Sequence, residues 1–204
     1  MGFNSRVVVE LPQPTHKGSV SLEETLNARR SVREFASIPL TLKQLSQILW
    51  AGQGQTHPRG LRTAPSAGAL YPLELVVAAG LVTDLPAGVY RYRPRKHNLS
   101  QLLEGDQRRA LAAAAVGQNW ISDAAAIVAV AAVYGRTTKE YGKRGVQYVH
   151  IDVGHAAQNV CLQAVALGFG STVVGAFDDS SVKQLLALAA EEEPVELIPI
   201  GRPR

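Results

Sequence analysis

The chain has 204 residues, of which 46% are hydrophobic, and this length and composition suit one globular domain with a substantial core. The net charge of +4 admits a basic nucleic-acid-binding module. The basic residues stand in short groups without a known nucleic-acid motif, so we expect no nucleic-acid partner. A single cysteine, Cys161, excludes a disulfide within the chain and any multi-cysteine metal site.

Residues 1–20 contain a short strand-like segment, VVVEL, followed by the turn-rich PQPTHKGS. They are predicted to form an N-terminal arm that precedes a single domain over residues 21–204. No run approaches the roughly 20 apolar residues that cross a bilayer. The first residues also lack an apolar core followed by a small-residue cleavage site. We therefore expect a cytoplasmic protein without a membrane partner.

Two helices are predicted after the arm. Ser21 and Glu24 have the spacing of a capping box, which favours a helix start. Thr41 opens a second predicted helix, which ends at Gly52 and Gly54. Residues 52–72 are rich in Gly, Pro, Ser and Thr, and they are predicted to form a long loop whose small residues let a ligand approach the backbone. A disordered insertion is the alternative interpretation.

Beyond this loop the sequence alternates predicted strands and helices. Alternating or continuously apolar runs predict strands at 73–79, 88–93, 98–103, 124–133, 172–177 and 195–200. Helix formers and helical spacing predict helices at 105–116, 146–168 and 180–190.

The predicted helix at 146–168 is apolar around most of its circumference. Its polar stripe consists of Asp152, His155, Asn159 and Gln163, and His155 is interpreted as a hydrogen-bonded core histidine. Such a helix needs cover on more than one side. We expect its own domain on one side and another partner, such as a second subunit, on the other.

Several familiar sites are missing from the sequence. It has no GxxxxGK phosphate loop and no HExxH zinc pair, and GFGSTV at 168–173 misses the dinucleotide fingerprint. Ser66 lacks the glycine pattern of a hydrolase nucleophile, so we interpret it as a hydrogen-bond donor. We therefore predict no metal site and name no catalytic residue.

The segment RRSVREF, residues 29–35, places three arginines and a serine within seven residues. Guanidinium groups grip phosphate oxygens in pairs, and a serine adds a neutral donor. A solvated basic helix end, where cations offset the helix dipole, is the other interpretation of this segment alone.

Four segments in order carry a resemblance to a known family: RRSxRxF, then PSAGALYP, then DxGHxxQNxxLxAxxLGxGSxxVGAF, then IGRP. Over about residues 21–202 the chain resembles the FMN-dependent nitroreductase superfamily, nearest to its SagB-type dehydrogenase branch. The resemblance implies an α+β fold with a mostly antiparallel central sheet flanked by helices. It also implies an intertwined homodimer with FMN at the subunit interface.

The resemblance also implies roles for particular residues. Arg29 and Ser31 would hold the FMN phosphate with Arg30 nearby, and Arg33 would lie beside the pyrimidine edge of the flavin. The remaining cofactor-binding residues implied are Pro65, Ser66, Ala67 and Gly68 from the partner subunit, Gly175 and Ala176 near flavin N5, and Arg202 as a second phosphate ligand.

The implied function is an FMN-dependent oxidoreductase. It would pass hydride from NAD(P)H to flavin N5 and then, by a ping-pong route, to a nitro- or quinone-like acceptor or in a SagB-type dehydrogenation. A flavin-binding sensor or storage protein without turnover is the alternative. Two departures from the family stand out. Ala69 replaces an asparagine of classical nitroreductases, and Glu140 separates Lys139 from Tyr141, a pair associated with azoline oxidation.

Overall fold

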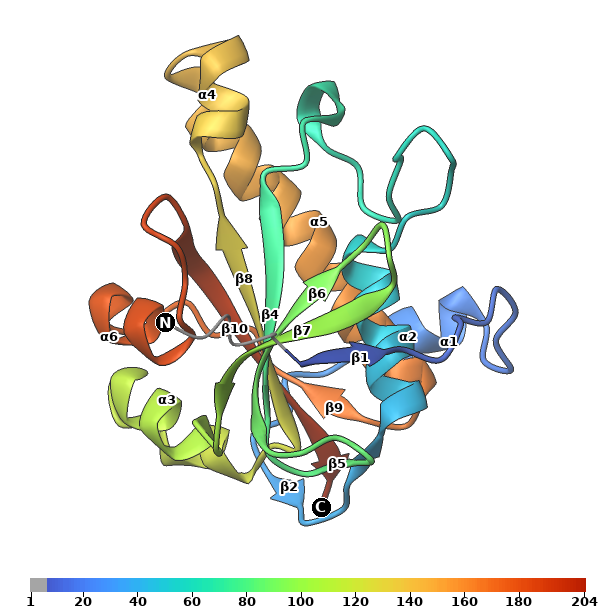
Figure 1. Cartoon of the computed structure of the whole chain (residues 1–204). Helices are drawn as coiled ribbons and strands as arrows, with labels where there is room; N and C mark the ends of the chain where they lie inside the picture. The colour runs from blue at the N-terminus through green and yellow to red at the C-terminus, as the bar shows by residue number, and fades with distance from the viewer. Residues whose placement is uncertain (1–6) are drawn as a thin grey trace.

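The computed structural model of the protein describes residues 7–204. A central sheet of eight strands runs in the order β1-β7-β6-β4-β8-β10-β2, and β9 also pairs with β10 (Figure 1). Every ladder in this sheet is antiparallel, whereas β3 and β5 form a separate parallel pair. The predicted α+β fold with a mostly antiparallel sheet is therefore confirmed. The strands are β1 Val8–Glu10, β2 Phe35–Ala36, β3 Leu40–Thr41, β4 Leu73–Ala79, β5 Val82–Thr83, β6 Gly88–Arg93, β7 Asn98–Glu104, β8 Ala126–Ala132, β9 Gly170–Ser171 and β10 Glu193–Pro203.

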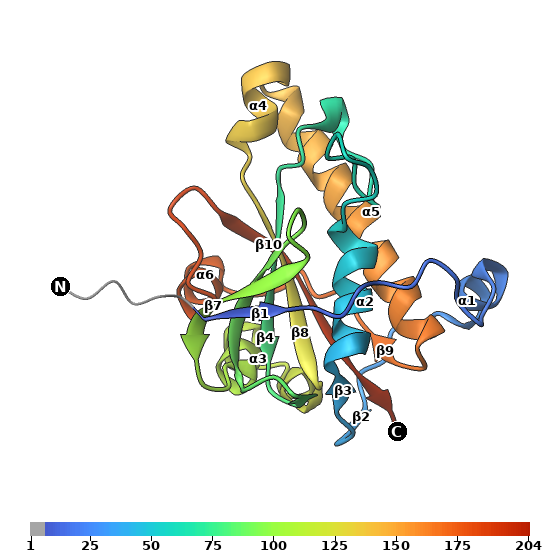
Figure 2. The same ribbon diagram turned by 45° about the vertical axis from the view of Figure 1, so that its right-hand side comes forward.

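The central strand β8 explains the two-layered core. All seven of its residues are buried, and alternate side chains enter two different clusters. Val128 and Val130 pack towards α2 (Leu42–Gln53) and α5 (Arg144–Ala166), whereas Ile127 and Ala129 pack towards α3 (Arg108–Ala114) and α6 (Asp179–Leu185). Figure 2 shows these two helix pairs on opposite sides of the sheet. Small and β-branched residues allow this strand to be covered on both faces.

The helices on the first face follow the sequence signals closely. Ser21 and Glu24 form a complete capping box at the start of α1 (Leu22–Ala28), and Thr41 does the same with Gln44 for α2. The long helix α5 buries one side against the sheet and α2, yet Val146 and Ile151 remain 40% and 45% exposed. This helix therefore carries uncovered apolar surface, as its sequence predicts.

The helices on the second face are shorter than predicted. Helix α3 begins after Gly105, whose φ is +87°, and stops before Val116, whose φ is +57°. Asp178 caps α6 by accepting from the Ser181 amide at 2.7 Å, and the left-handed Ala187 lies just beyond its end. Left-handed residues interrupt the helical hydrogen-bond pattern, so the predicted extensions are wrong.

Two local predictions are wrong, and one helix was not predicted. Residues 172–177 form a single bridge between Val174 and Leu197 in place of a strand, because the Asp178 amide donates to Ala114 and draws the chain towards α3. His155 is exposed, not a core histidine. Helix α4 (Gly135–Tyr141) was not expected, since its sequence lacks an apolar periodicity.

The N-terminal arm lies along the sheet and α2. Strand β1 pairs with β7, Leu11 is buried, and the Thr15 amide donates to Gln47 at 2.8 Å. The first six residues of the predicted arm lie outside the described part of the chain, and its separation from the domain stays a prediction. Within residues 7–204 no helix is long and apolar enough to cross a membrane.

Candidate functional site

The arginine-rich segment runs beside β9 at one end of α5. The Arg29 amide closes α1 by donating to Thr25, and the chain then extends so that Ser31 lies opposite Ser171 in a parallel bridge. The Val32 amide donates to Ser171 at 3.0 Å, and the Thr172 hydroxyl donates to the Val32 carbonyl at 2.6 Å. Residues from two distant parts of the sequence therefore form one edge.

Close contact at this edge depends on small residues. A Cβ at Gly170 would lie 2.6 Å from the Val32 side chain, which leaves no room for alanine. Arg202 on β10 joins the same region, where its Nη1 donates to the Gly168 carbonyl at 2.7 Å. Its guanidinium carbon also lies 4.8 Å from the centre of the Phe169 ring. Arg202 and the segment after α1 thus flank the 168–172 turn.

The arginines of this cluster have no counter-ions in the described part of the chain. Among residues 7–204, Arg29, Arg30, Arg33 and Arg202 take part in no ion pair within 4.0 Å. Arg30 donates instead to the carbonyls of Asn27 and Arg29, both at 2.8 Å, and so caps the end of α1. Arg33 lies over Trp120, with its guanidinium carbon 5.8 Å from the ring centre. Unpaired guanidinium groups around an exposed serine suit an oxyanion.

The segment after β9 leads from this cluster along the edge of β10. The Val174 amide donates to Leu197 at 2.8 Å, and the Leu197 amide donates back at 2.9 Å. Gly175 and Ala176 follow and are exposed. Their amides donate to no acceptor within the described chain, and no atom lies within 4 Å of a Cβ built on Gly175. Two exposed residues with unpaired backbone amides therefore follow the bridge, and the side-chain position of Gly175 is open.

The PSAGA loop lies towards the other end of α5. The Ser66 hydroxyl donates to Asp152 Oδ2 at 2.6 Å and accepts from the Tyr71 amide at 3.0 Å. Ser66 is thus a hydrogen-bond donor, as predicted, and its acceptor is a carboxylate that is only 4% exposed. Asp152 was noted only as part of the polar stripe, because sequence spacing cannot reveal a contact across 86 residues.

The loop has unusual backbone geometry. Gly68, Ala69 and Tyr71 have φ values of +60°, +53° and +46°. Left-handed conformations are unfavourable for residues with a side chain, so the Asp152 contact stabilises a loop that the local sequence disfavours. A Cβ at Gly68 would also lie 2.8 Å from the Tyr141 hydroxyl of α4. Glycine is therefore favoured here by conformation, and a larger residue would have to displace the Tyr141 side chain.

The two groups of predicted residues do not meet within one chain. Asp152 anchors the PSAGA loop, whereas Cys161 faces Ser171 near the arginine cluster. These two positions are nine residues apart on α5, or about 13.5 Å along a helix. Figures 1 and 2 show the loop that leads into β4 beside the upper part of α5, and β9 beside its lower part. One chain therefore presents two separated half-sites.

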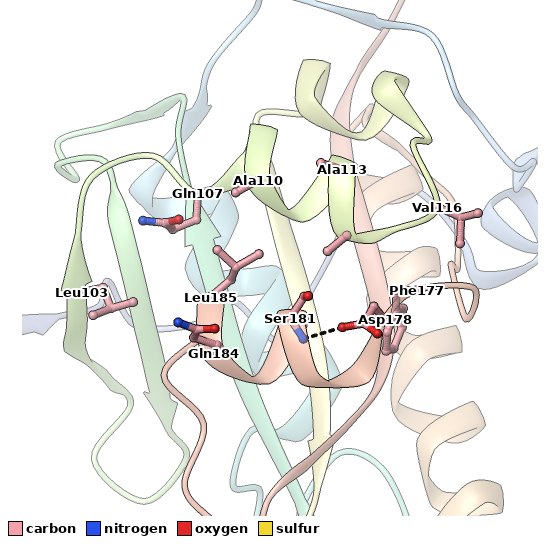
Figure 3. A pocket seen from close by; sticks show the side chains of 11 residues that line it. Leu103, Gln107, Ala110, Ala113, Val116, Phe177, Asp178, Ser181, Gln184 and Leu185 are labelled. Carbon is pink, nitrogen blue, oxygen red and sulfur yellow. Dashed lines mark hydrogen bonds between the residues drawn. The ribbon is translucent and has the colours of Figure 1, made fainter.

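A wide groove lies elsewhere, between α3 and α6. It has a volume of about 970 Å³ and is bordered by small and apolar side chains such as Ala113, Val116 and Leu185 (Figure 3). None of the eleven predicted cofactor residues lines it. On its polar rim, Asp178 caps α6 by accepting from the Ser181 amide. The groove is separate from the candidate site.

The comparisons with known proteins agree with this geometry. A family model described as the nitroreductase family matches residues 26–202. The chain belongs to this family. The protein MJ1384 of Methanocaldococcus jannaschii, named as a nitroreductase, is 47% identical over 183 residues, which cover 90% of this chain and 91% of that protein.

Crystal structures of two proteins described as nitroreductases share the fold of this family member. That from Anabaena variabilis has a TM-score of 0.87 and 30% identity, over 99% of this chain and 42% of the other. That from Ralstonia eutropha has a TM-score of 0.85 and 32% identity, over 100% of this chain and 92% of the other. Near-complete coverage of the Ralstonia protein shows that the same compact architecture occurs without additional domains.

Two more distant structures share the fold alone. The NADPH:FMN oxidoreductase of Vibrio harveyi, complexed with NAD+, has a TM-score of 0.64 and 24% identity, over 89% of this chain and 68% of the other. A chain of the Escherichia coli microcin synthetase McbBCD complex has a TM-score of 0.75 and 20% identity, over 99% of this chain and 79% of the other. These likenesses concern architecture and leave chemistry to the residues of this chain.

Proposed function

We propose that this member of the nitroreductase family is an FMN-dependent oxidoreductase that moves hydride from NAD(P)H to a second substrate by a ping-pong route. The observation that supports this proposal is the unpaired arginine cluster around Ser31, continuous with the free amides of Gly175 and Ala176. A phosphate and a flat, hydrogen-bonding ring need these two surfaces side by side. The Vibrio enzyme, which shares the fold, is named for the same cofactors.

The residues present fit FMN. Arg29 and Ser31 would hold the phosphate with Arg202, while Arg30 caps α1 beside them. Exposed Gly175 and Ala176 would approach N5 without side-chain obstruction. When bound, FMN supplies two-electron hydride chemistry that no side chain can provide.

Arg33 has a separate role in this proposal. Its guanidinium lies over Trp120 and has no counter-ion among the described residues. A fixed positive charge beside the pyrimidine edge stabilises negative charge there more than a neutral state. Arg33 would therefore favour the reduced cofactor without taking part in proton transfer.

A homodimer completes the site in this proposal. Pro65, Ser66, Ala67 and Gly68 would line the cofactor held by the partner chain, because the two half-sites lie at different positions along one α5. The exposed apolar residues of α1 and α5, such as Leu22 at 59% and Ile151 at 45%, support a contact between two copies on this face. Ser66 would contribute by holding the conformation of this loop, since its hydroxyl donates to Asp152 and is not free to bind the cofactor.

The second substrate is proposed only by class. A nitro- or quinone-like acceptor fits a site built from a cofactor, backbone amides and arginines. A SagB-type dehydrogenation is the other candidate, supported by the sequence resemblance. Glu140 separates Lys139 from Tyr141 on α4, which argues against azoline oxidation in a peptide. A cytoplasmic location is part of this proposal, and it rests on the same features of the sequence that led us to expect it.

An absorption spectrum tests the cofactor directly. The purified protein should be yellow, and NAD(P)H should bleach it under anaerobic conditions before a nitro- or quinone-like compound restores the colour. A colourless protein that takes up no added FMN would contradict the proposal. Rapid bleaching that no acceptor reverses would instead favour a flavin-binding sensor or storage protein.

A further inference from the structure

Glu196 is an acid whose side chain has no partner among residues 7–204. Its Oε2 atom is buried and makes no hydrogen bond, and no Lys or Arg within residues 7–204 forms an ion pair with it. Burial alone raises the pKa of its carboxyl group. Burying a carboxyl group without a hydrogen-bond partner costs free energy of folding, so its presence here needs an explanation. None of the ion pairs within residues 7–204 includes Glu196, so none of them stabilises its carboxyl group.

The register of the sheet fixes the direction of Glu196. It lies opposite Val130 of β8, and Val130 belongs to the core cluster beneath α5. Directly opposed residues of antiparallel strands share a face. Glu196 therefore points to the same face as Ile198 and Ile200, whereas Leu197 points to the α3 and α6 face.

Glu196 lies one residue from the bridge that joins β10 to the segment carrying Gly175 and Ala176. Val174 and Leu197 form an antiparallel bridge with both hydrogen bonds made. The bridge is isolated, and the residues that adjoin it on one side are Gly175, which has no side chain, and Glu196. The space where a Cβ of Gly175 would stand is open. An open position therefore adjoins the acid.

The same edge connects Glu196 with the phosphate-binding cluster. Ser171, opposite Ile200, starts the segment beside the arginines, and Gly175 lies four residues further on. Four residues span at most about 14 Å. The arginine cluster thus lies at one end of this short edge and Glu196 at the other.

We propose that Glu196 donates the proton to the second substrate reduced at this site. This inference rests on the proposed function. Reduction of an unsaturated acceptor X=Y needs a hydride, which carries two electrons, and one proton, so that X=Y + H⁻ + H⁺ gives HX–YH. NAD(P)H supplies the hydride by way of the cofactor and is oxidised to NAD(P)⁺. The Glu196 O–H bond breaks, its carboxylate remains, and water returns the proton.

Few other titratable groups face Glu196. On α5, burial is the main cause that raises the pKa of the Cys161 thiol, and the charge of Glu196 raises it further. Strand β8 contains no titratable residue, and residues 172–176 contain none. On β10 itself the Glu193 carboxylate is paired with Lys183 of α6 at 2.8 Å. A pH dependence of proton donation therefore belongs to Glu196.

Stopped-flow measurement of the two half-reactions tests the proposal in the FMN-loaded protein. Glu196→Gln should leave bleaching by NAD(P)H within about twofold, since that step needs no proton from Glu196. It should slow reoxidation by a quinone about 100-fold, at the low end for general-acid catalysis. In the parent protein reoxidation should slow as pH rises through the pKa of Glu196, and the variant should lose this dependence.

Glu193→Gln is the matched control, because it removes an exposed carboxylate from the same strand. It should leave both half-reactions unchanged. An unchanged reoxidation rate and pH profile in Glu196→Gln would overturn the proposal. So would an equal loss in the Glu193 control.

A carboxyl titration by ¹³C NMR gives a readout independent of turnover. One glutamate signal should titrate above the usual range, vanish in Glu196→Gln and shift on addition of FMN. A signal that does not respond to bound FMN would place Glu196 away from the cofactor and refute the inference. A protein that binds no FMN at all would instead refute the proposed function, so the two failures are distinguishable.

Discussion

The two half-sites along α5 handle their polar groups in opposite ways. At β9 the guanidinium groups of Arg29, Arg33 and Arg202 have no counter-ion among the described residues. At the PSAGA loop the Ser66 hydroxyl is bound to Asp152 and to the Tyr71 amide. The first region keeps its donors for a ligand, whereas the second uses its donors to hold a backbone shape.

This difference indicates how each region should respond to substitution. Removing an unpaired cation should lower the stability of the fold little, because no internal partner loses a hydrogen bond. It should lower the affinity for a bound anion much more. Removing a buried hydrogen-bond partner costs the fold first, since the remaining group stays desolvated. Ligand affinity and stability therefore separate the two regions experimentally.

The largest expected effect on FMN binding comes from a substitution that prevents two copies of the chain from forming the proposed dimer. Ile151→Asp places a charge on the uncovered face of α5, where a second copy is proposed to pack. We expect a monomer by analytical ultracentrifugation and loss of bound FMN. Val116→Asp, on the other face of the sheet and 75% exposed, is the control and should keep both. A monomeric parent protein with full FMN content would contradict the shared site.

Arg29→Ala should weaken FMN by about 100-fold, because a charged hydrogen bond to phosphate contributes about 1.5–3 kcal/mol. Fluorescence titration measures this affinity, and thermal unfolding of the apoprotein should be unchanged. Arg109→Ala, which removes another exposed arginine on α3, should keep the affinity of the parent. Equal affinities of the parent for FMN and riboflavin would show that no phosphate anchor exists.

Asp152→Ala should instead lower the free energy of unfolding by about 2 kcal/mol, the usual value for a hydrogen bond to a charged group. A double-mutant cycle with Ser66→Ala, followed by denaturant unfolding, isolates the contact. We expect most of the two single losses to be shared. Additive losses would mean that the loop does not depend on this hydrogen bond.

Arg33→Ala should make the midpoint potential of bound FMN more negative by about 30 mV, which for a two-electron couple corresponds to about 1.4 kcal/mol. The physical reason is loss of a fixed positive charge near the anionic edge. Spectroelectrochemistry measures the shift, with Arg30→Ala as a control that should leave the potential in place. An unchanged potential in the Arg33 variant would remove its proposed role.

The smallest effect concerns stability against pH. The folded state raises the pKa of Glu196, so the folded carboxyl keeps its proton at pH values where the unfolded one has lost it. Stability should fall as pH rises from the ordinary carboxyl pKa to the raised one, and should remain lower above it. Glu196→Gln should lack this part of the decline in pH-dependent denaturant unfolding. An identical decline in both proteins would indicate that the carboxyl is not held in a buried environment.

Much of the fold was predictable because local sequence and burial pattern agreed. The capping boxes before α1 and α2, the continuous apolar run of β8 and the length of α5 all appear at the expected places. Residues 172–177 failed as a strand because β-branched composition cannot reveal that the Asp178 amide is drawn to Ala114. Glu196 had a sequence signal that was missed, since it occupies a position of the apolar series that continues at Ile198 and Ile200.

The sequence by itself determined the family, the α+β class and the identity of the polar groups available for a phosphate. These properties depend on residue type, order and periodicity, all of which are written along the chain. Only the tertiary structure decided which donors are free and which are occupied: Arg29 faces no counter-ion within the described chain, whereas Ser66 is held by Asp152 across 86 residues. Occupancy depends on long-range contacts that packing creates, so neighbouring residues in the sequence cannot reveal it.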